Sequence, residues 1–128
     1  MEEPRDTQGL EFDWFAVDQD GSLALFATAG QGPVPSSVFK ALDAYDAIGE
    51  AIPISGLGSS AVWQSYAEAG LYAFDWSESL GSYIRVAEPA AGIKFKQAQA
   101  VLAIPGLPRL PNSFAHSEVV HPTWQDVT

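Results

Sequence analysis

Residues 11–28, EFDWFAVDQDGSLALFAT, decide the fold of this chain, because they hold two short apolar runs on either side of one turn. In each run, apolar residues occupy both positions of a two-residue alternation, which is typical of a strand covered on both faces. Between the runs, Asp18 opens and Gly21 closes a four-residue segment of the kind that type I turns prefer. The stretch therefore predicts a β-hairpin.

A second hairpin is expected from Leu71 to Ala87, with its turn in 77–82. Between the hairpins, helical spacing of apolar residues predicts one helix from Ser36 or Ser37 to about Gly49 and another from Ser59 or Ser60 to Gly70. Residues 96–104 suggest a short helix or turn, and 114–120 a last strand. We expect an α+β fold: an antiparallel sheet built from two β-hairpins, with two or three short helices packed on it.

Length and composition place the chain among single globular domains. It has 128 residues, 47% of them hydrophobic and 17% charged. We expect one α+β domain at 11–128 behind a flexible leader at 1–10. Disulfides and thiolate metal sites are excluded because there is no cysteine. The acidic start and the lack of a long apolar stretch predict a cytoplasmic protein that does not enter a membrane.

Charge narrows the kinds of partner. Sixteen acidic residues face six basic ones, which gives a net charge of −10. Such a surface repels phosphate backbones and anionic lipids, so nucleic acid and membranes are poor partners. A basic protein or a cation fits this charge, and simple solubility remains the alternative.

No motif in the chain predicts a catalytic, cofactor or metal site. In Asp18-Gln19-Asp20-Gly21 the glycine comes too early for a calcium loop, and the residues that follow offer few ligand oxygens. His116 and His121 would point to opposite faces of a strand and so could not chelate one ion. Ser37 and Lys40 fit S-x-x-K, but the partner motifs of that chemistry are missing.

Two enzymatic alternatives stay open. Gly56, Gly58 and Ala61 fit G-x-G-x-x-A, with Asp75 about twenty residues further on, as in a dinucleotide-binding unit. Pro53 in the supposed strand, and hairpins on both sides, argue against that reading. The second alternative is a glycosidase-type carboxylate pair at Asp13 and Asp75, each beside a tryptophan.

Four Trp, four Tyr and seven Phe are more rings than a small core easily hides. Rings next to turns are candidates for a recognition surface, because tryptophan and tyrosine are preferred interface anchors. Phe15, Phe26, Phe39 and Trp63 are expected in the core. The predicted partner-binding residues are Asp13, Trp14, Asp18, Asp20, Asp75, Trp76 and Glu78.

Three segments, DWFAVDQDGSLALFATAGQGPVP, GLYAFDW and YIRVAEP, resemble strand and turn sequences of bacterial polymorphic-toxin immunity proteins. The resemblance spans most of residues 11–90 and carries no residue roles. It implies a cytoplasmic protein that binds and neutralises one secreted toxin domain, with a nuclease as one candidate, in a stoichiometric complex. A small nucleotide-binding or enzymatic domain using the Gly56–Asp75 segment and a regulatory interaction module without a toxin are the other hypotheses.

Overall fold

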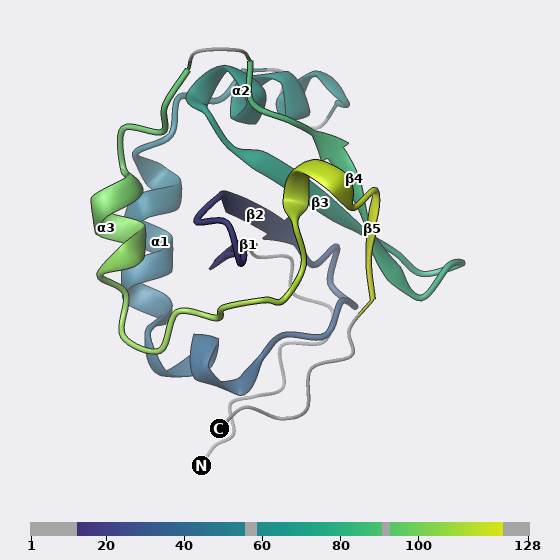
Figure 1. Cartoon of the computed structure of the whole chain (residues 1–128), viewed down its shortest axis with the longest axis horizontal. Helices are drawn as coiled ribbons and strands as arrows, with labels where there is room; N and C mark the ends of the chain where they lie inside the picture. The colour runs from purple at the N-terminus through teal and green to yellow at the C-terminus, as the bar shows by residue number, and fades with distance from the viewer. Residues whose placement is uncertain (1–12, 56–58, 91–92, 122–128) are drawn as a thin grey trace.

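The computed structural model describes residues 13–55, 59–90 and 93–121, which fold around one five-stranded sheet (Figure 1). The strands run in the spatial order β1 (Asp13–Val17), β2 (Leu23–Ala27), β3 (Tyr72–Ser77), β4 (Ser82–Ala87) and β5 (Val119–Val120). The helices are η1 (Ser36–Lys40), α1 (Leu42–Glu50), α2 (Ala61–Ala69), α3 (Ala98–Leu102) and η2 (Phe114–His116), where η marks a 3₁₀ helix. The predicted α+β class is confirmed. The leader expected at 1–10 lies outside the described residues.

Both predicted hairpins are present, but the sheet is mixed. β1 pairs antiparallel with β2, and β3 pairs antiparallel with β4. The two hairpins join through β2 and β3, which are parallel. The predicted antiparallel pairing is confirmed within both hairpins. Their junction is parallel, because the chain leaves β2, crosses through η1, α1 and α2, and re-enters the sheet in the same direction.

Aromatic rings fill the space on one face of the sheet. Trp14 stacks on Phe26 with a centroid distance of 4.5 Å, and Phe26 stacks on Phe74 at 5.0 Å. Phe114 of η2 lies 5.9 Å from the Phe26 ring, so the C-terminal segment covers this face. In Figure 1 this segment crosses in front of the strands.

The other face of the sheet packs against the helices. Phe15 lies parallel to Tyr45 of α1 at 6.2 Å and contacts Phe95 at 6.5 Å. β1 and β2 are therefore covered on both faces, as the double apolar alternation predicts.

The first predicted helix is two elements, because its phase breaks at Ala41, whose φ is −139°. Pro35, and neither Ser36 nor Ser37, is the residue before η1, and no side chain caps it. α2 ends at Gly70 as expected, with φ of 98°. Among the described residues, no helix is long and apolar enough to cross a membrane.

Candidate functional site

Two of the seven predicted partner-binding residues are buried and cannot contact a partner. Trp14 is fully buried, and its indole N–H donates to the Tyr83 hydroxyl over 3.4 Å. Asp18 is 5% exposed. The expectation that these side chains lie at the surface is wrong. Although β1 is an edge strand of the sheet, its residues after Asp13 are buried, and the segment at Phe114 packs over Asp18.

The Asp18 carboxylate accepts hydrogen bonds from three backbone N–H groups. Its Oδ1 accepts from the N–H groups of Asp20, at 2.9 Å, and Ser22, at 2.8 Å. Its Oδ2 accepts from the N–H of Phe114 at 2.7 Å, ninety-six positions away. One carboxylate therefore shapes the β1–β2 turn and fastens η2 to it. Asp18-Gln19-Asp20-Gly21 is a turn, with φ of 86° at Gly21.

Of the remaining five predicted residues, Asp20 lies at one end of the sheet and the other four lie toward the opposite end. Asp20 is exposed in the β1–β2 turn. Trp76 is half-buried near the β3–β4 turn, where its indole N–H donates to exposed Glu78 at 2.7 Å. Asp13 and Asp75 occupy one row of the sheet, each paired with Ala27. The structure thus separates Asp20 from the other four. Asp13 and Asp75 lie on the helix-covered face, whereas Trp76 packs on Tyr83 on the opposite face.

The row that holds Asp13 and Asp75 bears on the carbohydrate alternative. Both side chains are half-buried and share the helix-covered face, with two strand spacings, roughly 10 Å, between their Cα atoms. Burial, and secondarily the charge of Asp13, raise the pKa of Tyr66 to about 12. That tyrosine stays protonated at neutral pH. Neither carboxylate lines the groove beside β4 or the pocket between α2 and residues 93–97.

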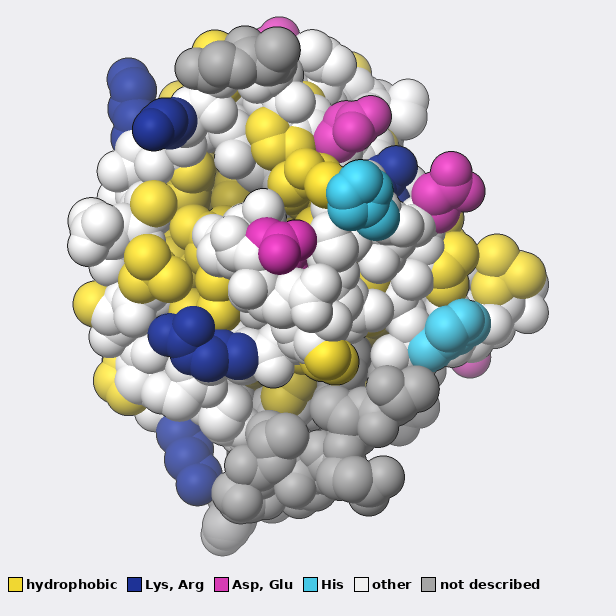
Figure 2. Space-filling view, viewed as in Figure 1, with side chains coloured by type: hydrophobic (Ala, Val, Ile, Leu, Met, Phe, Trp, Pro, Cys, Tyr) yellow, Lys and Arg dark blue, Asp and Glu magenta, His cyan; other side chains and the backbone are white. Residues whose placement is uncertain are grey.

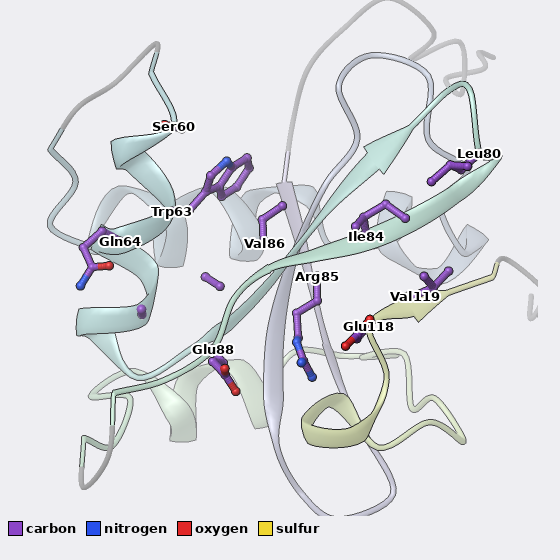
Figure 3. Close-up of a pocket in the computed structure, with 12 residues that line it drawn as sticks. Ser60, Trp63, Gln64, Leu80, Ile84, Arg85, Val86, Glu88, Glu118 and Val119 are labelled. Atoms are coloured by element: carbon purple, nitrogen blue, oxygen red, sulfur yellow. The ribbon is translucent and has the colours of Figure 1, made fainter.

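A surface groove lies elsewhere, between α2 and the outer strands β4 and β5, with a volume of about 800 Å³ (Figure 3). We call it the α2–β4 groove. Ile84 of β4 and Val119 of β5 pair directly and form its floor with Val86. Trp63 of α2 forms a wall, and Leu80 at the tip of the β3–β4 turn closes one end.

A bulge in β4 adds one more apolar residue, Val86, to the floor of the groove. The β3–β4 register shifts so that Phe74 faces Arg85 while Ala73 faces Ala87, which leaves Val86 as an extra residue. A bulge breaks the strict alternation of side chains. Val86 and Ala87 therefore both line the groove.

Two carboxylates, those of Glu88 and Glu118, and one guanidinium, that of Arg85, line the groove, so the acidic groups outnumber the basic one. The Arg85 guanidinium turns to η2, where it donates to the carbonyl oxygens of Phe114 at 2.7 Å and Ala115 at 3.0 Å. Glu88 and Glu118 are exposed, and neither side chain has a hydrogen-bond or ion-pair partner in the part of the chain that the structure describes. The groove therefore has an apolar floor and an acidic edge.

Sequence reasoning missed this site because no motif marks it. Trp63, predicted in the core, is half-buried as the groove wall, and Phe39 is likewise only half-buried. One signal is present in the sequence: Leu80 is an apolar residue within a turn of serines and glycine, and it is 66% exposed.

The residues that were considered in the sequence for metal binding are not brought together in the described part of the chain. No group of three or more His, Cys, Asp or Glu there could hold a metal ion. His116 and His121 lie apart, the first in η2 and the second just after β5. The His121 Nδ1 lies 2.6 Å from the Ser82 hydroxyl, a contact the sequence did not predict. Ser82 is 1% exposed, so this pair fastens β5 to the hairpin and offers no accessible nucleophile.

The dinucleotide-binding alternative requires a strand directly before the glycines, and the structure shows none there. Residues 53–55, which would form the strand before the glycines, are not a strand, and Gly56 and Gly58 lie outside the described residues. The parallel pairing of β2 and β3 removes one objection to this reading, since the flanking hairpins do not exclude a parallel pair. Ser37 and Lys40 lie within η1, and Ser37 is half-buried.

Charged side chains separate across the view in Figure 2. Lysine and arginine lie mainly toward α1 and α3, whereas carboxylates and both histidines lie toward η2 and the β4–β5 side. On the face that Figure 2 shows, basic and acidic side chains therefore lie on different sides. Comparison with protein families, curated proteins and solved structures gives no match.

Proposed function

We propose that this chain is an immunity protein, which binds a cognate bacterial toxin domain and neutralises it in a stoichiometric complex. The α2–β4 groove is the observation that carries the proposal. It combines exposed apolar side chains with unpaired carboxylates, which is the composition of a protein-binding surface with a hydrophobic centre and a polar rim. The resemblance in residues 11–90 supports the same class of protein.

Net charge supports a basic partner. With −10 on 128 residues, the protein attracts a positively charged domain over long range and speeds their encounter. A toxin that cleaves nucleic acid needs a basic cleft, and carboxylates can take the place of phosphates there. A nuclease domain is therefore the toxin class that fits best, and the cytoplasm is where its substrate would need protection.

Co-expression tests the proposal. The product of the adjacent upstream gene is expressed with and without this chain, and cell survival and co-purification are measured. We expect the toxin to kill cells alone and to be harmless with this chain, as a one-to-one complex that weakens as salt rises. A neighbouring product that is harmless, or that forms no complex even at low salt, would contradict the proposal and favour a regulatory module.

A further inference from the structure

The α2–β4 groove has the dimensions of one missing helix. α1 packs on β1, and α2 packs on β3 and β4, so helices cover this face of the sheet only as far as β4. Beyond α2, the side chains of Ile84 and Val119 lie side by side at the open edge of the layer. The floor from 84 to 88 is roughly 15 Å long, which matches about ten helical residues.

An extended peptide fits this place poorly. Peptides that add to a sheet need a regular free edge on which to continue the backbone ladder. Here β5 already pairs with Tyr83 and Ile84, and the Arg85 N–H donates to the Glu118 carbonyl at 2.8 Å. The bulge at Val86 then interrupts the ladder. The binding surface is therefore formed by side chains, which a helix can contact along one face.

The rim determines the charge of that helix. Glu88 and Glu118 lie at the lower edge of the groove in Figure 3, below the apolar side chains of Val86 and Ile84. Arg85, the cation that lines the same groove, donates to the carbonyl oxygens of Phe114 and Ala115 and forms no hydrogen bond with either glutamate among the described residues. A bound helix with lysine or arginine beside its apolar stripe would pair with both glutamates, whereas an acidic helix would be repelled.

We infer that the α2–β4 groove binds an amphipathic α-helix of the toxin domain, with apolar residues on one face and basic residues beside them. This inference rests on the proposed function and names the part of the partner that the site takes. The helix lies beside α2, with its apolar stripe on Ile84, Val86 and Val119 and its basic side chains at Glu88 and Glu118.

A peptide titration tests the inference without the toxin. The probe is a synthetic helix of about 18 residues made of leucine, lysine and alanine, with leucine spaced to form one stripe. Its controls are the same peptide with glutamate for lysine and a scrambled peptide without helical spacing. Chemical shifts of backbone amides and of the Trp63 indole are followed by NMR. We expect the basic helix to move the signals of 60–67, 80–88 and 118–119, and the controls to leave them in place.

Two matched variants separate local pairing from overall charge. The double variant Glu88→Lys/Glu118→Lys changes the groove rim, and Asp46→Lys/Glu50→Lys makes the same charge change on exposed positions of α1. We expect the first to weaken peptide binding at least about tenfold and the second no more than about threefold.

Equal binding of the acidic or scrambled peptide, or signal changes outside the groove, would overturn the inference. So would an equal loss of peptide affinity in both double variants. Groove signals that shift when the protein alone is diluted would show that a second copy occupies the groove and would also overturn it. If the toxin binds and the Glu88→Lys/Glu118→Lys variant still neutralises it, the inference fails and the proposed function stands. If the peptide binds the groove but no toxin complex exists, the proposed function fails.

Discussion

Replacing Asp18 by alanine should destabilise the protein far more than the loss of an exposed acidic side chain. The substitution leaves the buried N–H of Phe114 without its 2.7 Å acceptor, and such an orphan costs about 1–3 kcal/mol. The two turn bonds, to the N–H groups of Asp20 and Ser22, are partly exposed and add about 0.5–1 kcal/mol between them, since water replaces the carboxylate. The sum is about 3 kcal/mol, a large share of the 5–15 kcal/mol typical of a domain.

Urea unfolding followed by tryptophan fluorescence measures this loss. With a slope of about 1.5 kcal/mol per molar, the midpoint should fall by about 2 M. Asp20→Ala is the control, because that side chain is exposed two positions away, and its midpoint should stay within about 0.3 M. Asp18→Asn should not rescue stability, because its amide NH₂ meets an N–H donor. A midpoint for Asp18→Ala within 0.3 M of the parent (about 0.5 kcal/mol), or full stability of Asp18→Asn, would refute this role of the carboxylate.

Three further predictions concern the core. Tyr83→Phe removes a buried hydroxyl that donates to the Pro33 carbonyl at 2.8 Å and accepts from Trp14, so thermal unfolding should show a loss of about 2 kcal/mol; an unchanged melting temperature would contradict it. Gly70→Ala places a Cβ 2.6 Å from the Phe95 nitrogen at φ of +98°, so it should lower the free energy of unfolding by about 3 kcal/mol. Gly81→Ala, whose Cβ would have nothing within 4 Å, should lower it by about 1 kcal/mol. Equal losses of stability in the two variants would argue against the contact at Gly70. Burial raises the pKa of Tyr45, Tyr66 and Tyr83 above the ordinary 10, to about 12 for Tyr66. The folded protein therefore keeps these hydroxyls protonated longer than the unfolded chain does, so its free energy of unfolding should decrease between pH 10 and 12. In urea titrations, Tyr66→Phe should show a smaller decrease over this pH range.

Local patterns were sufficient to predict both hairpins. The turn around Gly21 and the alternation on both sides of it depend on neighbouring residues, and so does the left-handed end of α2 at Gly70. The parallel pairing of β2 with β3 is different, because it depends on how the helices between them carry the chain back to the sheet. Nothing within either strand records that direction.

The candidate site was harder to predict for the same reason. Its floor joins Val119 to Ile84, thirty-five positions apart, and its accessibility depends on how little of β4 the helix α2 covers. Asp18 was expected to be exposed because it lies in a turn. It is buried instead, because the distant segment at Phe114 packs over it and donates a backbone hydrogen bond to its carboxylate. Turn position predicts backbone shape well and burial poorly.

Hydrogen exchange of the protein alone and in complex with the cognate toxin domain tests the central claim most directly. If the groove is the binding surface, amides in 60–67, 82–88 and 118–120 should exchange more slowly in the complex, and α1 should be unchanged. Slower exchange confined to α1, α3 or the β1–β2 turn, with the groove unaffected, would contradict it.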